Sequence, residues 1–153
     1  MNEMINTMLM QIPAKSENES FVRSVVAAFC AGLNPTIDEI NDIKTAVSEA
    51  VTNCVVHAYQ KRQSNHDLIT VECKLFPAML EVIISDNGVG ITDINQAMEP
   101  FFTTQPHDER SGMGFTVMQS FMDTISVNNQ TGGGTVVTMQ KNFTKDKQEV
   151  SGD

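Results

Sequence analysis

The sequence is short of basic residues. Ten lysines and arginines stand against nineteen aspartates and glutamates, which gives a formal net charge of −9. A protein that binds nucleic acid through its phosphates needs a basic face, so the composition argues against that partner. The same deficit argues against an anionic membrane surface. A phosphate ligand would have to be held by local features, such as a helix N-terminus, a metal ion and a few well-placed cations.

Cysteines are also scarce, and the three present, Cys30, Cys54 and Cys73, are far apart and odd in number. We expect buried reduced thiols rather than a disulfide framework or a metal site. No apolar run approaches the roughly 18 residues of a membrane-spanning helix, and the N-terminus lacks the pattern of a signal peptide. These absences predict a cytoplasmic protein without a membrane anchor.

The length of 153 residues suits one soluble globular domain, with 41% hydrophobic and 19% charged residues. We expect this domain to occupy residues 1–143. The polar segment 144–153 is expected to be a disordered tail.

Residues 16–33 are expected to form the first helix, because apolar residues recur there at helical spacing. Ser16 and Glu19 are spaced as a capping box at its start. Its predicted core face is Phe21, Val25, Ala28, Phe29 and Leu33. Arg23 lies off this stripe, where an arginine is either solvated or contacts a partner.

Residues 36–59 are expected to form the second helix, with Thr36 and Glu39 as its capping box. Its predicted core face is Ile40, Ile43, Val47, Ala50, Val51, Cys54 and Ala58. A third helix should follow Ser111, which is a candidate N-cap.

Apolar and β-branched runs predict strands at residues 4–12, 68–76, 79–85, 124–129 and 135–141. Residues 87–111 show no sustained periodicity, and a loop of that length in a compact domain is usually a functional lid or disordered. The order of elements predicts an α+β fold: a two-layer sandwich with helices on one face of a mixed, mostly antiparallel sheet.

The stretch after the predicted strand 79–85 carries the first candidate site. A strand delivers Asp86, and Gly88 and Gly90 follow within four residues. Glycines let a backbone bend where a Cβ would clash. Taken alone, this is the ordinary chemistry of a turn at the end of a strand.

Two further signals are equally weak when isolated. Glu49 and Asn53 are four residues apart and project from nearly the same side of the second helix. Gly112 and Gly114 open the third helix just after Arg110, where free N–H groups favour an anion. Neither a Walker A loop nor a Rossmann fingerprint occurs.

The order of these signals is more specific than any one of them. Four motifs follow one another: Glu49 with Asn53, Asp86 with Gly88 and Gly90, Gly112 with Gly114, and Gly134 with Thr135. This order resembles the GHKL ATP-binding superfamily, which includes gyrase, Hsp90, histidine kinases and MutL. The resemblance covers nearly the whole chain and implies a Bergerat-type ATP-binding fold.

Segments 16–23, 47–53, 100–104 and 109–115 are similar to the anti-sigma-factor serine kinases of spore-forming bacteria. The anti-sigma F type is the nearest, and the stress-response anti-sigma B type is the alternative. The resemblance implies a homodimer that binds a sigma factor and phosphorylates a serine of an anti-anti-sigma factor. ATP or ADP and Mg²⁺ are the implied cofactors, and Arg23 is a candidate partner contact.

The resemblance also implies how adenine is held. Asp86 would accept a hydrogen bond from the exocyclic amine, with Thr135 supporting it through water. A buried carboxylate is a demanding partner and should reject a base that lacks the amine. Gly88 and Gly90 would shape the turn under the base.

At the phosphate end, the resemblance implies that Asn53 binds Mg²⁺ through its amide oxygen. Glu49 would act as general base on the attacking hydroxyl, or orient it. Residues 91–111 would form the ATP lid. The implied phosphate and lid contacts are Thr103, Thr104, Arg110, Ser111, Gly112, Met113 and Gly114.

Two residues limit this transfer of roles. Gln105 stands where the family often has a lysine, so a lysine–phosphate contact is absent from the lid. His57 lies one turn beyond Asn53, where it either approaches phosphate or packs on the helix surface.

Two other functions stay open. One is a module of the same fold that binds nucleotide and sigma factor but transfers nothing; Glu49 argues against it, because binding alone requires no base. The other is the catalytic half of a histidine kinase. None of the three histidines, His57, His66 and His107, lies in a helical hairpin that precedes the ATP domain.

Overall fold

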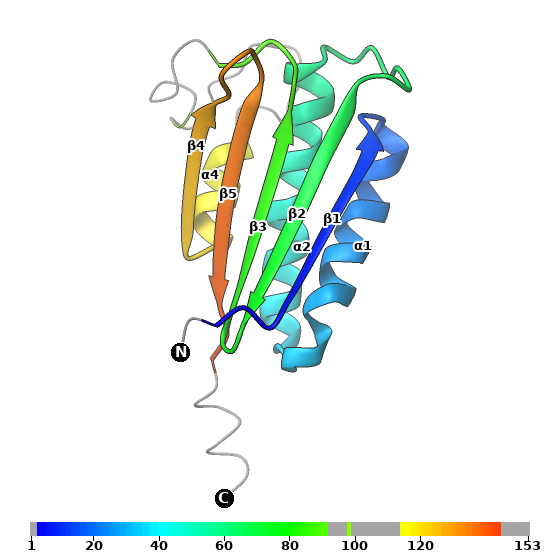
Figure 1. The fold of residues 1–153 in the computed structure, drawn as a ribbon. Coiled ribbons are helices and arrows are strands. Elements are labelled where there is room, and N and C mark those ends of the chain that lie inside the picture. Colours follow the sequence, from blue (N-terminus) through cyan, green and yellow to red (C-terminus); the bar gives the residue numbers. More distant parts are fainter. Residues whose placement is uncertain (1–2, 92–97, 99–113, 145–153) are drawn as a thin grey trace, which may run out of the picture.

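One five-stranded sheet forms the centre of this computed structural model, which describes residues 3–91, 98 and 114–144. The strands lie in the order β1-β2-β3-β5-β4. Their bounds are β1 Asn6–Pro13, β2 Leu68–Phe76, β3 Met79–Asp86, β4 Thr124–Asn129 and β5 Thr135–Asn142. Helices α1 (Glu19–Cys30), α2 (Ile37–Asn53) and α4 (Gly114–Phe121) cover one face of the sheet (Figure 1). The predicted two-layer α+β class is confirmed.

The sheet was expected to be mixed, but each of its four described pairings is antiparallel. Two helices, α1 and α2, connect β1 to β2, so the chain returns to the end of the sheet it left and β2 runs back along β1. Only α4 is described between β3 and β4, which places these two strands in the same direction. They are not neighbours, because β5 lies between them.

Helix α1 differs from its prediction at its start. Residues Ser16–Asn18 form a 3-10 turn, and no side chain caps the helix at Asn18. The N–H of Ser16, which a capping box would give to Glu19, is donated to the Oε1 atom of Gln63 at 3.1 Å. The carboxylate of Glu19 instead lies 3.2 Å from Arg23.

The buried face of α1 was predicted only in part, since Phe29 and Leu33 pack against the core as expected. Val22, Val26 and Cys30 are fully buried, whereas Phe21 is 52% exposed and Ala28 is exposed. The predicted stripe and the buried stripe are both apolar. They are offset by one residue along the helix, which corresponds to a rotation of about 100°. Packing against α2 and the sheet selects the second stripe.

Helix α2 is capped as predicted. The N–H of Glu39 donates to the Thr36 hydroxyl, and the N–H of Thr36 donates to the Glu39 carboxylate. The second carboxylate oxygen of Glu39 accepts from the N–H and hydroxyl of Thr144, which the sequence placed in the tail. The helix ends at Asn53, and residues Cys54–Ala58 continue it as a π-helical turn rather than as α-helix to Tyr59.

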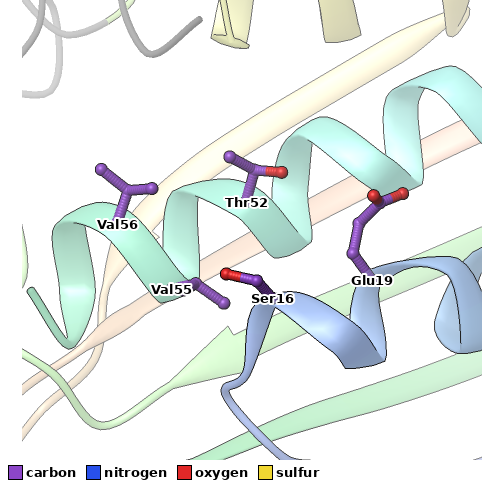
Figure 2. Close-up of a pocket in the computed structure, with 5 residues that line it drawn as sticks. All are labelled: Ser16, Glu19, Thr52, Val55 and Val56. Carbon is purple, nitrogen blue, oxygen red and sulfur yellow. The ribbon is translucent and has the colours of Figure 1, made fainter. Parts of the chain in front are cut away.

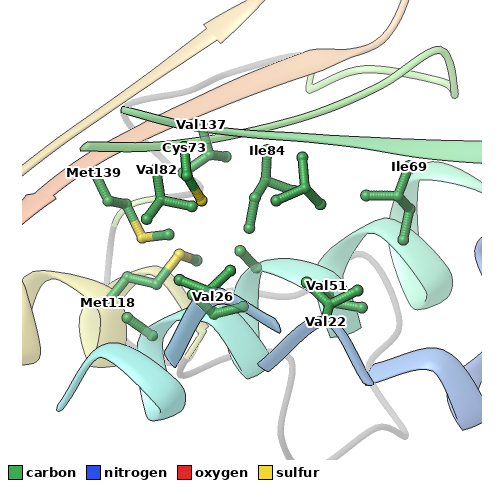
Figure 3. Packing of buried hydrophobic residues seen from close by; sticks show 14 of the residues in the cluster. Val22, Val26, Val51, Ile69, Cys73, Val82, Ile84, Met118, Val137 and Met139 are labelled. Atoms are coloured by element: carbon green, nitrogen blue, oxygen red, sulfur yellow. The ribbon is translucent and has the colours of Figure 1, made fainter. Parts of the chain in front are cut away.

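The core lies between the helix layer and the sheet (Figure 3). Alternate residues of β2 and β3 point into it, including Ile69, Val82 and Ile84, and they meet Val51 of α2 and Met118 of α4. The three cysteines are free and buried, as expected. Burial raises the pKa of Cys30 to about 11 and that of Cys73 to about 12, so both stay thiols.

Over the described residues, no helix combines the length and the apolar character needed to cross a bilayer. Across the same part of the chain, no three histidine, cysteine or acidic side chains gather as a metal site would need.

Candidate functional site

Four segments that are distant in the sequence meet at one end of the molecule. The C-terminal ends of α2 and β3, the N-terminus of α4 and the loop between β4 and β5 all lie at the upper end in Figure 1. The predicted residues Glu49, Asn53, Asp86, Gly114 and Thr135 belong to these segments. The fold therefore brings these residues, which are dispersed in the sequence, to one end of the molecule.

Asp86 is the last residue of β3 and is only 5% exposed. Its Oδ1 atom accepts hydrogen bonds from the N–H of Gly88 at 2.9 Å and the N–H of Thr135 at 3.2 Å. Its Oδ2 atom accepts from the thiol of Cys54 at 3.6 Å. Burial raises the pKa of Asp86, and these three hydrogen bonds oppose the rise because they stabilise the carboxylate. The result is a rigidly held acceptor.

Thr135, which was predicted to support Asp86 through water, contacts it in this structure through its backbone N–H. Gly134 makes this contact feasible. Its φ is +94°, and a Cβ there would lie 2.0 Å from the carbonyl oxygen of Asp86. Only glycine lets β5 begin this close to the end of β3.

Gly88 forms the contact between the turn after β3 and the end of α2. A Cβ at Gly88 would lie 2.2 Å from the carbonyl oxygen of Ala58. The same oxygen accepts a hydrogen bond from the N–H of Val89 at 3.1 Å. Gly90 has a φ of +78°. Both glycines thus hold backbone geometries that a side chain would disturb.

Three residues that the sequence did not single out complete this turn. The hydroxyl of Tyr59 donates to the carbonyl of Leu68 and accepts from the N–H of Asn87, both at 2.7 Å. Gln130 donates its side-chain amide to the carbonyl of Asp86. The side chain of Asn129 pairs with both backbone groups of Ile91, by bonds of 2.9 Å and 2.7 Å. These contacts join residues that are far apart in the sequence, so no local sequence pattern predicts them.

Glu49 and Asn53 lie in a different environment. Both are half-buried on α2, one turn apart, and the Oε2 atom of Glu49 is buried. Ala46 and Ala50 are buried beside them, and Ala50 was predicted to lie on the core face. Asn53 directly precedes Cys54, whose thiol contacts Asp86. Glu49 and Asn53 therefore lie on the helix just before that contact. His57, one turn later, is also half-buried.

A family model described as "Histidine kinase-like ATPase domain" matches residues 12–141. The "Anti-sigma F factor" of Clostridium beijerinckii is 51% identical over 138 residues, which cover 90% of this chain and 95% of that protein. That of Thermoanaerobacter sp. is 50% identical over 145 residues, which cover 95% and 99%. The chain belongs to the anti-sigma F factor family of histidine kinase-like ATPase domains.

A solved structure of another protein shares the fold of this chain. The crystal structure of the RsbU and RsbW domains of a Mycobacterium tuberculosis protein superimposes with a TM-score of 0.62 at 18% identity. The match spans 90% of this chain and 32% of that one. Because the identity is low, this likeness concerns the fold alone.

In this anti-sigma F family member, Arg23 joins two helices. Its guanidinium lies 3.2 Å from Glu19 one turn earlier on α1 and donates to the hydroxyl of Ser48 on α2 at 3.4 Å. The side chain is still 38% exposed. Arg23 is therefore held in place at the surface, and its hydrogen-bond partner Ser48 directly precedes Glu49 on α2.

A pocket of about 210 Å³ lies between the start of α1 and the end of α2 (Figure 2). Its lining residues are Ser16, Glu19, Thr52, Val55 and Val56. Thr52 follows Glu49 by three residues, so the pocket borders the same side of the helix. Ligand pockets usually enclose about 300–1,000 Å³. This pocket is too small for a nucleotide, and the sequence did not predict it.

The remaining predicted residues lie outside the part of the chain that the structure describes. They are Thr103, Thr104, Gln105, Arg110, Ser111, Gly112 and Met113. Gly114 is described, and it is the first residue of α4.

Proposed function

We propose that this chain is an anti-sigma factor with protein serine kinase activity. It binds a sporulation sigma factor of the F type and transfers the γ-phosphoryl group of ATP to a serine of an anti-anti-sigma factor. The observation that carries the proposal is the buried carboxylate of Asp86, held at the same end of the fold as Glu49 and Asn53. Relatives about half identical carry the F-type name, which favours this type over the stress-response type.

Adenine recognition falls to Asp86. Among the described residues, its Oδ1 atom accepts two N–H groups, whereas Oδ2 accepts a single thiol. Each carboxylate oxygen has about two acceptor positions. The open position on Oδ2 would take a proton of the exocyclic amine, and a base with a carbonyl there would place two acceptors face to face.

Mg²⁺ would be held by Asn53. Its amide oxygen and the neighbouring carboxylate of Glu49 are the hard oxygen donors that this ion prefers. Mg²⁺ usually keeps several waters and binds through one or two protein groups plus phosphates, so a single asparagine suffices. When bound, the ion would offset the charge that develops on the transferred phosphoryl group.

Glu49 would serve as the general base. Its carboxylate takes the proton of the serine hydroxyl as the serine Oγ atom bonds to the γ-phosphorus. The bond from that phosphorus to the β–γ bridging oxygen breaks, and ADP leaves. The phosphate passes directly to the partner, so no phosphorylated form of this chain is needed.

The partner surfaces are part of the proposal. Arg23 is fixed at the surface near Glu49 and offers a guanidinium to an acidic group of a partner. A homodimer is supported by β1, which lies at the edge of the sheet and exposes Leu9 by 68%. We place the activity in the cytoplasm, where the three buried thiols would stay reduced.

The decisive experiment incubates the protein with γ-labelled ATP, Mg²⁺ and candidate anti-anti-sigma proteins, and identifies the serine that gains label. Label on a serine of one of them is expected. Acid-labile label on this chain, at a histidine, would instead favour a histidine kinase. Binding of a sigma factor with no label on any acceptor would favour a nucleotide-dependent binding module.

Glu49→Gln separates chemistry from binding. We expect serine phosphorylation to fall by about 10²–10⁴-fold, because a general base contributes that much, while ATP affinity is retained. Glu72→Gln makes the same chemical change on the face of β2 that points away from the helices, and it should leave both quantities unchanged. Unchanged phosphorylation in Glu49→Gln would remove Glu49 from the mechanism.

A further inference from the structure

The thiol of Cys54 makes an unusual contact for a buried cysteine. It donates to the Oδ2 atom of Asp86 at 3.6 Å across 32 residues of sequence. The other buried cysteine with a described hydrogen bond, Cys30, donates locally to the carbonyl of Ala27. Cys54 thus joins two structural elements at the centre of the candidate site, while Cys30 does not.

The described hydrogen bonds around Asp86 account for three of its roughly four acceptor positions. Gly88 and Thr135 occupy Oδ1 with backbone N–H groups. Cys54 occupies one of the two positions on Oδ2. Without the thiol, no described donor would contact Oδ2. The carboxylate could then rotate, which would change the angle at which its lone pairs meet a bound base.

The thiol is enclosed next to Asp86, because Cys54 is only 5% exposed. Its backbone is fixed as well, because the N–H of Cys54 bonds to the carbonyls of both Ala50 and Val51 where α2 passes into the π-helical turn. The backbone that carries the donor is therefore fixed next to Asp86.

We propose that Cys54 is a positioning residue for base selection: it holds Oδ2 of Asp86 so that a single acceptor position faces the exocyclic amine of adenine. This inference rests on the proposed role of Asp86 in binding ATP. Cys54 does not touch the reacting phosphate. It also lies next to Asn53, so the same turn that carries the proposed Mg²⁺ ligand also sets the base-reading carboxylate.

The test measures the affinities of each variant for ATP and for purine riboside triphosphate, which lacks the exocyclic amine. The ratio of the two affinities, obtained by calorimetry, reports base selection separately from stability. We expect Cys54→Ala to lower this ratio about threefold to tenfold, mainly by weakening ATP, because one hydrogen bond to a charged group is lost. Cys54→Ser, which keeps a donor, should restore most of the ratio.

Cys30→Ala is the matched control. It removes a buried thiol from α1 and should lower the melting temperature while leaving the ratio as in the wild type. A wild-type ratio in Cys54→Ala would overturn the inference and make Cys54 a packing residue only. If Cys54→Ala fails to fold, Cys54→Val fills the volume without supplying a donor and is judged by the same ratio.

Asp86→Asn, measured in parallel, distinguishes the two levels of the proposal. If ATP affinity is unchanged in Asp86→Asn, the adenine site itself is wrong. If affinity falls in Asp86→Asn but the ratio is unchanged in Cys54→Ala, the site stands and the role of Cys54 is wrong.

Discussion

The two ends of the candidate site are built differently. Asp86 is 5% exposed, and three hydrogen bonds from three separate segments fix its carboxylate. Glu49 and Asn53 are half-buried on one side of a helix. On our proposal, adenine meets a hydrogen-bond acceptor that is already in place before the nucleotide binds. Phosphoryl transfer, in contrast, also uses groups that arrive with the nucleotide.

With the proposed roles, this difference follows from what each end recognises. A neutral amine offers one weak hydrogen bond, so selectivity requires an acceptor that cannot turn away or be replaced by water. Triphosphate and Mg²⁺ carry large charges, which attract their ligands strongly even when those are partly solvated. Changes at the first end should therefore weaken nucleotide binding whether or not Mg²⁺ is present, and changes at the second should affect chemistry or metal dependence alone.

The largest effect on stability is expected from Gly88→Ala. Its Cβ would lie 2.2 Å from the backbone oxygen of Ala58, so the turn must move away from α2. Overpacking of this kind costs about 3 kcal/mol at the upper end of its usual range. Denaturant unfolding measures this loss, and calorimetry should show weaker ATP binding.

Gly32→Ala is the control for that change. A Cβ at Gly32 meets nothing within 4 Å, and the residue lies far from the site in the turn after α1. Stability should stay within about 1 kcal/mol of the wild type, or rise slightly because alanine restricts the unfolded chain. Equal losses in the two variants would show that the contact of Gly88 with Ala58 is unimportant.

The next effect tests the two ends against each other. Asp86→Asn keeps the shape but places an amide donor opposite the adenine amine, so ATP affinity should fall about 30-fold, or about 2 kcal/mol. The loss should be the same with and without Mg²⁺. Asn53→Ala should weaken only the Mg²⁺-dependent part of binding. If both variants respond to Mg²⁺ alike, the division between the two ends is wrong.

Asp86→Asn should not destabilise the nucleotide-free protein. The pKa of Asp86 is raised in the fold by burial, so the folded protein disfavours the charged carboxylate relative to the unfolded chain. Replacement by a neutral amide removes that cost at neutral pH. Denaturant unfolding without nucleotide should therefore give a stability equal to or above that of the wild type.

The smallest effect is expected far from the site, at the start of α2. Glu39→Gln should reduce stability by about 1 kcal/mol with no change in ATP affinity, because an amide group then opposes the N–H of Thr144. Burial raises the pKa of Glu39, but hydrogen bonds from Thr36 and Thr144 outweigh it, and the net shift is downward. The stabilisation is therefore fully present above the ordinary pKa of 4.5 and is lost as the pH falls below it.

The pH dependence provides its own control. Unfolding free energies of wild type and Glu39→Gln should differ at pH 7 and converge as the pH falls well below 4.5. A difference that stays constant down to pH 3 would mean that the ionised carboxylate is not the cause.

Local patterns predicted much of the fold. The neighbouring strands 68–76 and 79–85 and the Thr36–Glu39 capping box were predicted correctly, because the interactions that define them are local in the sequence. The Ser16–Glu19 box failed although its spacing is the same. Gln63, nearly fifty residues away, takes the N–H that the box requires. A sequence pattern cannot reveal such a distant competitor.

The candidate site divides in the same way. Asp86 and its glycines were predicted as site residues because their order along the chain resembles that of a known family. The donors that fix Asp86 were missed in part: Cys54 was predicted only as a core residue, and Gln130 was not noticed. A buried thiol and a loop glutamine become partners of one residue only once α2, β3 and β5 are packed together.

The three buried cysteines have a practical consequence. They are distributed over α1, the end of α2 and β2, and each is reached by a thiol reagent only when its own part of the fold opens. The natural chain thus carries three built-in reporters of local opening, with no engineered label. Mass spectrometry of the modified peptides would follow them separately, and protection by nucleotide confined to Cys54 would map the ligand onto this end of the fold.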